Sequence, residues 1–230
     1  MEDKVTEKMN KGREYRDLQI NIAEVADTPE QEYRVEGYAS TYDDLYTLYT
    51  MKCEDGYTIT VQEEVDRHAF DNADMTDVIM QYDHQGRVFA RISNGTLTLN
   101  KDDEKGLHVD AYLGGTETGR QLYEEIKGGY TRKMSFGFTV DKDNFEQTEA
   151  TKEGEVWTRR ILSVGKVYDV SAVSLPANDY TAISARKYCE GVIADIESER
   201  TRKAQEDEEK RLIAERKKAL ELRIKALRRE

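Results

Sequence analysis

The sequence predicts an α+β fold: a β-barrel of six or more short strands, surrounded by a few helices and followed by a charged C-terminal helix. Short segments of alternating apolar and polar residues recur from about Leu18 to Ala185, which is typical of strands with one buried face. Many short strands with one or two helices favour a barrel. Residues 186–230 contain no proline and are rich in Ala, Glu, Lys, Arg and Leu, which favours a helix.

Charge separates these two parts of the chain. The 230 residues carry 35 Lys and Arg against 47 Asp and Glu, a formal net charge of -12. Residues 186–230 hold 14 of the basic and 11 of the acidic residues, so residues 1–185 have a net charge of about -15. Sequence-independent binding to phosphate needs clustered basic residues, and we therefore expect no nucleic-acid partner.

Several other classes of protein are disfavoured by what the sequence lacks. It has no apolar run of the roughly 18–20 residues that a membrane span needs, and no apolar signal core near its first residue, so we expect a cytosolic protein with no membrane partner. Cys53 and Cys189 are far apart and show no metal-ligand spacing. The sequence also lacks a phosphate-binding loop, HExxH and CxxC, and we expect no metal and no cofactor.

We divide the chain into a flexible N-terminal segment (1–17), one domain (18–186) and a charged helical, coiled-coil-like tail (187–230). No Pro-rich or Gly/Ser-rich linker interrupts the domain. The tail carries an apolar stripe spaced like the seam of a coiled coil over barely two heptads, formed by Ile213, Leu220, Ile224 and Leu227. A solvated single helix, a short coiled coil and a docking helix for a larger partner all remain open for the tail.

The strands of the domain are predicted from their alternation. They are Tyr33 to Ser40, Gly106 to Leu113, Lys133 to Val140, Trp157 to Val164 and Lys166 to Leu175. In the third of these, Met134, Phe136 and Phe138 are expected to point into the core. Val88 to Leu99 is predicted to form a hairpin, because Asn94-Gly95 lies between two β-rich runs.

Two segments of the domain are predicted to interrupt the strands. Gln62 to Asp71 is expected to form a short turn or helix. Thr116 to Lys127 has an apolar helical stripe and is followed by Gly128-Gly129, which predicts a helix that ends there.

Among the three histidines, His84 is the best candidate for a general base. It follows the apolar run Val78 to Met80 and precedes Gln85-Gly86, so it lies where a buried strand meets a loop, a rigid position that is open to substrate. A histidine that simply caps a strand end is the alternative. His68, in a polar turn, and His108, on the polar face of its strand, are better explained as surface or packing residues.

Ser135 and Asp169 are the matching candidates for a nucleophile and an orienting carboxylate. Ser135 lies among large apolar residues, and Gly137 leaves space on the same strand face for an incoming carbonyl group. The alternative is an interior serine bonded to a backbone carbonyl. Asp169 lies in an apolar strand and needs a partner, either an imidazolium or an arginine such as Arg159 or Arg160. A serine activated by an oriented histidine is a nucleophile.

The chain resembles the phage prohead (procapsid maturation) proteases of the HK97 type from about Val35 to Ala185. The blocks that carry the resemblance occur in the family's order and include VDRHAFD, VIMQYDHQGRVF, KMSFGF and YDVSAVSLPAND. Each block alone is a weak signal, but the combination is specific. These proteases are similar in fold to the herpesvirus assemblins, which implies a β-barrel surrounded by helices.

The resemblance implies a serine endopeptidase that acts inside the phage procapsid, in the host cytoplasm, without a cofactor. Its implied partners are the scaffold and the major capsid protein, whose delta segment it would remove, and it would also cut itself. The family's catalytic histidine matches His84, its nucleophile Ser135, and its acidic residue, usually Glu, matches the shorter Asp169. Because assemblins are activated by dimerisation, a homodimer is a further implication, and the sequence leaves the oligomeric state open.

The substrate pocket, the function and the tail leave further hypotheses open. We take Gly137 and the loop residues Pro176, Ala177 and Asn178 as candidates for shaping the oxyanion pocket or the substrate groove. The Tyr-rich stretch from Asp43 to Tyr57 departs from the family, which often has a shorter turn there. A catalytically inactive capsid-assembly or scaffolding protein, binding through the tail, is the alternative function. The tail itself is expected either to dock or to be removed by autoproteolysis.

Overall fold

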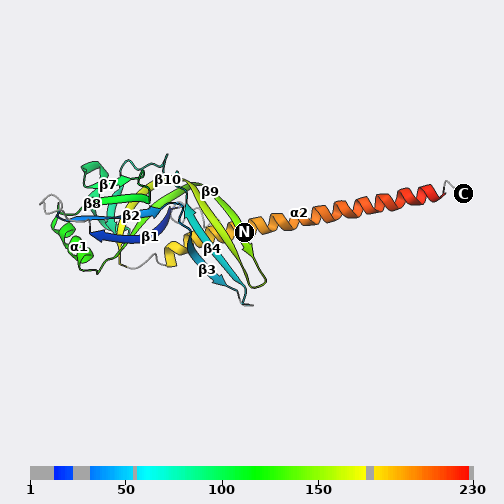
Figure 1. Ribbon diagram of the computed structural model, residues 1–230, viewed down its shortest axis with the longest axis horizontal. Helices are drawn as coiled ribbons and strands as arrows, with labels where there is room; N and C mark the ends of the chain where they lie inside the picture. The colour runs from blue at the N-terminus through cyan, green and yellow to red at the C-terminus, as the bar shows by residue number, and fades with distance from the viewer. Residues whose placement is uncertain (1–12, 23–31, 54–55, 175–178, 228–230) are drawn as a thin grey trace. The chain divides into compact units, whose positions relative to one another are not determined.

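The computed structural model describes residues 13–22, 32–53, 56–174 and 179–227 (Figure 1). It forms two compact units, Met1–Arg186 and Lys187–Glu230. The elements in order are β1 (Arg13–Ile22), β2 (Arg34–Thr41), β3 (Tyr46–Lys52), β4 (Thr58–Val65), β5 (Ile79–Tyr82), β6 (Gln85–Arg91), the 3-10 helix η3 (Ile92–Asn94), β7 (Leu97–Asn100), β8 (Gly106–Tyr112), α1 (Glu117–Lys127), β9 (Lys133–Ala150), β10 (Gly154–Val173) and α2 (Asp179–Leu227).

The strands form one ten-stranded sheet in the order β3-β4-β10-β9-β1-β2-β8-β7, with β5 paired to β10 and β6 paired to β5. The predicted α+β class is correct, but the predicted barrel is wrong, since pairing between the described strands does not close the sheet into a ring. The prediction assumed short strands, whereas β9 and β10 have 18 and 20 residues. β10 pairs with β4 along its first half and with β5 near its end, so the sheet branches.

β10 combines two segments that the sequence predicts as separate strands. Its pairing with β9 is interrupted by register shifts between Ile161 and Asp169. Irregularities of this kind break the strict alternation on which the prediction rests, without ending the strand. The predicted strand Lys133 to Val140 is likewise only the first part of β9.

The hairpin predicted around Asn94-Gly95 is also wrong. A turn does form there, with Gly95 at φ 74° and the Asn94 side chain accepting hydrogen bonds from Thr96. However, η3 redirects the chain, and β6 pairs with β5 while β7 pairs with β8. The local turn signal is therefore correct, but it does not specify which strands pair.

The N-terminal strand β1 lies between β9 and β2. Residues 13–17, which we placed in a flexible segment, pair with β9 from Arg13↔Thr139 onward, so the sheet begins before the predicted start of the domain. The rest of the three-part division remains a prediction. Two further strands were not predicted: β3 lies in the Tyr-rich stretch, and β4 includes the beginning of the segment expected to be a turn or helix.

The apolar core lies on one face of the sheet. Leu107, Val109, Ala111 and Leu113 are buried as their alternation predicts, and so are Met134, Phe136 and Phe138. The predicted helix is α1: the Thr116 side chain accepts from Gly119 N at its start, and the backbone turns left-handed at Gly129 after it. It adds Leu122, Tyr123 and Ile126 to the same core.

A cluster of buried charged side chains ties β1 to β4 and β10. The guanidinium group of Arg16 donates to both Glu63 and Glu14, and that of Arg159 donates to the same two carboxylates and to Asp143. Burial alone would raise the pKa of Glu14, but Arg16 and Arg159 outweigh it and lower the pKa to about 2. Glu14 is therefore charged at neutral pH, and a buried charge of this kind needs its partners.

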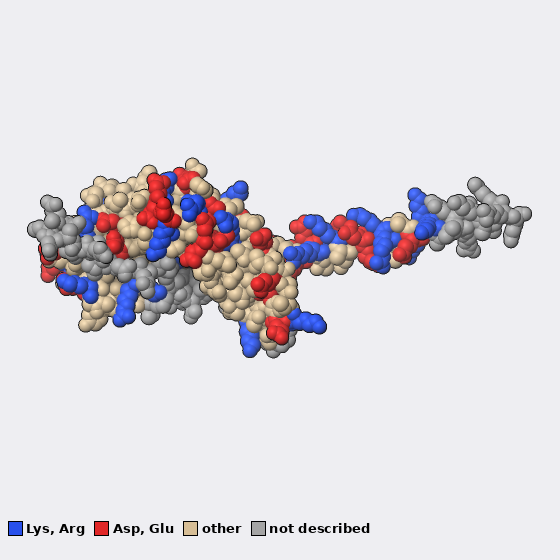
Figure 2. Space-filling view, viewed as in Figure 1, with Lys and Arg blue, Asp and Glu red and all other residues tan. Residues whose placement is uncertain are grey.

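The charged C-terminal helix predicted from composition is present as α2, which has 49 residues. Figure 2 shows basic and acidic side chains intermixed along it. Several are paired one turn apart, including Lys203 with Glu199 and Arg211 with both Glu208 and Glu215. Leu212 and Ile213 are exposed in a helix that is otherwise largely polar here.

The buried charge cluster gives a prediction about stability. The change Arg159→Met leaves Glu14 and Glu63 with one fewer cation, and we expect it to lower the free energy of unfolding by about 3–5 kcal/mol. Denaturant unfolding followed by circular dichroism measures this difference. Arg91→Met is the control, because its ion pair with Asp77 is about half exposed and its loss is expected to cost no more than about 1 kcal/mol. Equal losses in the two variants would contradict the prediction.

Candidate active site

Three strands bring Ser135, Asp169 and His84 together. In the antiparallel pairing of β9 with β10, Ser135 lies opposite Ser171, and Gly137 lies opposite Asp169. Residues two apart on a strand point to the same face, so the hydroxyl and the carboxylate share a face of the sheet. β5 runs parallel to the end of β10, with Tyr82 beside Ala172, and His84 follows in the turn between β5 and β6.

His84 is hydrogen-bonded through both ring nitrogens. Its Nε2 lies 2.8 Å from Ser135 Oγ, and its Nδ1 lies 2.6 Å from Asp169 Oδ1. An ionised carboxylate can only accept, so Nδ1 carries the proton and Nε2 is left to accept from the serine hydroxyl. A histidine held in this tautomer can take the hydroxyl proton while the carboxylate stabilises the resulting imidazolium.

The Asp169 carboxylate is buried, with 2% of the residue exposed, and several groups compensate its charge. Ser171 Oγ donates to Oδ1 over 2.9 Å, and the Arg13 guanidinium lies 3.9 Å from Oδ2. The arginines considered as alternative partners lie elsewhere: Arg159 belongs to the buried charge cluster, and Arg160 pairs with Glu64, Asp66 and Asp43.

The side chains of Asp169 and Tyr15 lie over Gly137, where we expected open space. A Cβ atom there would lie 2.6 Å from Asp169 Oδ2 and 2.9 Å from Tyr15 Cε1. The space over this glycine is therefore filled by the protein's own side chains, and the expectation that it leaves room for a substrate carbonyl is wrong. The Tyr15 ring also packs on His84, with ring centroids 4.2 Å apart. Gly137 is the position that lets Asp169 and Tyr15 approach β9.

The other two histidines are not part of this arrangement. His68 is exposed and lies 3.2 Å from Asp71, and His108 lies 3.7 Å from Glu36. Pro176, Ala177 and Asn178, expected near the oxyanion pocket, lie outside the described residues. In the described part of the chain, no three His, Cys, Asp or Glu side chains are grouped in a way that could hold a metal ion.

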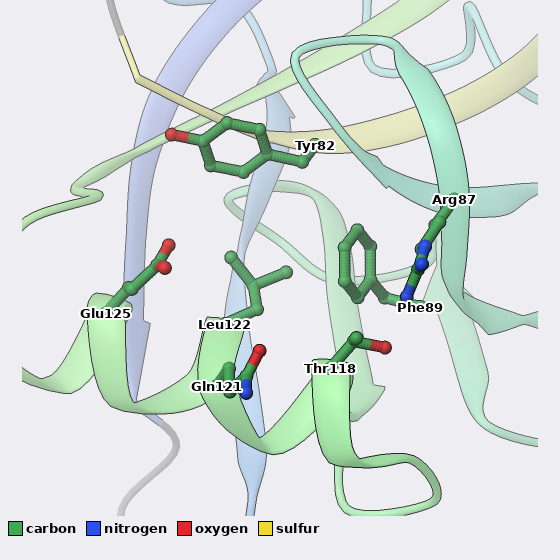
Figure 3. Close-up of a pocket in the computed structure, with 7 residues that line it drawn as sticks. All are labelled: Tyr82, Arg87, Phe89, Thr118, Gln121, Leu122 and Glu125. Atoms are coloured by element: carbon green, nitrogen blue, oxygen red, sulfur yellow. The ribbon is translucent and has the colours of Figure 1, made fainter.

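A cavity of about 390 Å³ lies between α1 and the β5–β6 hairpin (Figure 3). This volume is in the range of small-ligand sites. Tyr82 and Arg87 in its wall come from the same hairpin as His84 and flank the turn on either side in sequence. The other lining residues are Phe89 from β6 and Thr118, Gln121, Leu122 and Glu125 from α1.

Sequence reasoning missed three side chains that surround the trio. Ser171 could have been found, because it lies two residues from Asp169 on a predicted strand and so shares its face. Arg13 and Tyr15 could not be found in this way, because the first half of β1, residues 13–17, has no alternating apolar residues and does not read as a strand. Their contacts depend on pairing with a strand that is distant in sequence.

Comparison with known proteins identifies a family. The sequence model of the family described as Caudovirus prohead serine protease matches residues 17–192, which is most of the chain. No curated protein and no solved structure matches the chain. In the part of the chain that the structure describes, no helix is both long and apolar enough to cross a membrane. Because the family model covers most of the chain, the chain belongs to the caudovirus prohead serine protease family.

Proposed function

We propose that the chain is an endopeptidase in which Ser135 is the nucleophile, His84 the general base and Asp169 the residue that orients His84. The observation that carries the proposal is the double hydrogen bonding of His84, to Ser135 through Nε2 and to Asp169 through Nδ1. Family membership makes the protein a serine peptidase of capsid maturation, with capsid protein as its substrate in general terms. The assignment of individual residues is the further step.

The proposed reaction is acyl transfer. Ser135 Oγ attacks the carbonyl carbon of the scissile peptide bond while its proton passes to His84 Nε2. The tetrahedral intermediate then collapses, the C–N bond breaks, and His84 returns the proton to the leaving amine. Water, deprotonated by His84, hydrolyses the acyl-enzyme and restores the serine. Throughout, Asp169 accepts from His84 Nδ1 and compensates the charge of the imidazolium.

The proposed substrates are the scaffold or the delta segment of the major capsid protein, and the chain itself. This follows from the family's role inside the procapsid. We further propose that the cavity beside the β5–β6 hairpin receives a substrate side chain. Its apolar and aromatic residues offer a surface to bury, and it lies beside the hairpin whose turn carries His84.

The first prediction concerns processing. We expect the wild-type chain to cut itself or co-expressed major capsid protein, and Ser135→Ala and His84→Ala to leave both intact, because each variant loses a participant in proton transfer. Intact-mass spectrometry over several hours identifies the fragments. Processing by Ser135→Ala at the wild-type rate would exclude this serine as the nucleophile. If the wild type cuts nothing while folded, the inactive assembly protein becomes the better hypothesis.

The second prediction concerns Gly137. In Gly137→Ala the added methyl group collides with the Asp169 carboxylate and the Tyr15 ring. Moving Asp169 away from His84 is expected to slow labelling of Ser135 by a fluorophosphonate at least ~10-fold, the rate equivalent of about 1.4 kcal/mol. Gly115→Ala is the matched control, because a Cβ atom there meets nothing within 4 Å. Labelling at the same rate in both variants would show that the close approach at Gly137 is not needed.

The third prediction concerns the cavity. Gln121→Trp places a large ring at its exposed helical wall, and we expect slower cleavage of capsid protein with unchanged fluorophosphonate labelling. The small reagent needs only the reacting groups, whereas a protein substrate needs its side-chain site. Glu124→Trp, at an exposed position on the same helix outside the cavity lining, is the control. If Gln121→Trp and Glu124→Trp cleave capsid protein equally fast, the cavity is not a substrate site.

A further inference from the structure

The turn that carries His84 has an unusual backbone. β5 and β6 are joined through two residues, Asp83 and His84, since Tyr82 pairs with Gln85. Both turn residues are left-handed, with φ 49° and 58°. Two-residue hairpins of this type strongly prefer Asn-Gly or Asp-Gly, because glycine adopts positive φ without a steric penalty. Here the second position is occupied by a histidine, for which a left-handed backbone is unfavourable.

The side chain of Asp83 ties this turn to the end of β10. Its carboxylate accepts from Ser174 N at 2.9 Å and from Ser174 Oγ at 2.9 and 3.1 Å. The backbone N–H of Asp83 also donates to Ala172 O at 2.9 Å. β10 is the strand that carries Asp169. The turn with the histidine is thus fastened to the strand with the carboxylate that the histidine contacts.

The position of the His84 ring depends on this backbone. A residue that changes from left-handed to right-handed φ points its Cα–Cβ bond in another direction, and the ring moves with it. The contacts to Ser135 and Asp169 are 2.8 and 2.6 Å, and both cannot survive such a rotation. Unfavourable backbone conformations persist at functional sites only when the surrounding structure enforces them. Beside the contacts of His84 itself, the turn is held by the hydrogen bonds between Asp83 and Ser174.

We propose that Asp83 is a positioning residue: through Ser174 it holds the β5–β6 turn in the left-handed conformation that brings His84 to both Ser135 and Asp169. This inference rests on the proposed function of the three residues. Asp83 touches none of the reacting atoms in this scheme. Its effect is on the fraction of molecules in which His84 is aligned, and therefore on the rate of the chemical step and not on the binding of a reagent.

The test is fluorophosphonate labelling of the full chain, analysed as kinact and KI. Asp83→Gly keeps a residue that favours the left-handed turn but removes the carboxylate, and we expect kinact to fall at least ~10-fold with KI unchanged. Asp83→Asn tolerates the same backbone and keeps one acceptor for Ser174, so it is expected to recover most of the rate. Asp102→Gly, which removes an exposed loop carboxylate, is the control and is expected to label like wild type.

Ser174→Ala tests the other side of the contact. It removes the hydroxyl donor and leaves the backbone N–H, so we expect a smaller, few-fold fall in kinact without the backbone change of the glycine variant. A wild-type kinact in Asp83→Gly would overturn the inference, and so would a loss confined to KI or a loss in Asp83→Asn as large as that in Asp83→Gly.

A second measurement does not depend on activity. A proton held between His84 Nδ1 and Asp169 gives a downfield proton NMR signal, which we expect in the wild type and Asp83→Asn and expect to be lost in Asp83→Gly. Persistence of that signal in Asp83→Gly overturns the positioning role. If wild type shows the signal but is not labelled at Ser135, the proposed function fails, and the NMR comparison alone decides the role of Asp83.

Discussion

The antiparallel register between β9 and β10 is the constraint on which the site depends. It places Ser135 opposite Ser171 and Gly137 opposite Asp169, and the apolar neighbours Phe136 and Val170 face the core. A slip of one residue would move the polar groups into the core and the apolar ones to the site. The burial of the apolar residues therefore selects the register that aligns the hydroxyl with the carboxylate, although the apolar residues take no part in the chemistry.

β1 contributes side chains to both faces of the sheet, the face with Ser135 and Asp169 and the face with the apolar core. Arg13 and Tyr15 reach Asp169 and His84, while the alternate residues Glu14 and Arg16 enter the buried charge cluster with β4 and β10. One strand is thus held by ionic contacts on one face and supplies contacts to the site on the other. Its buried groups are charged, so the strand is fixed in place by directional hydrogen bonds in addition to apolar packing.

The sequence predicts those parts of the fold and of the site that depend on interactions between residues close together in the chain. α1 and β8 follow from local periodicity and capping, and both form where we expected them. Ser135, His84 and Asp169 could be nominated from residue type and family resemblance, because their neighbours in sequence already mark them as unusual. Their catalytic roles remain predictions.

Features that depend on distant partners could not be predicted. The first half of β1 reads as a polar segment, and its buried charges find partners in Glu63 and Arg159, far along the chain. The open sheet differs from the predicted barrel because β10 changes its neighbour from β4 to β5, which alternation does not encode. The filled space over Gly137 likewise depends on Tyr15, brought there by strand pairing.

The position of β1 in the sheet also has a kinetic consequence. Its main partner, β9, lies near the other end of the domain in sequence, with Arg13 paired to Thr139. Contacts between such distant segments form late, because the entropy of closing the long intervening loop opposes them. During synthesis on the ribosome, the Tyr15 and Arg13 side of the site therefore stays unassembled until β9 has emerged, and Asp169 follows only with β10. The residues that surround His84 therefore come together only after most of the domain has been synthesised.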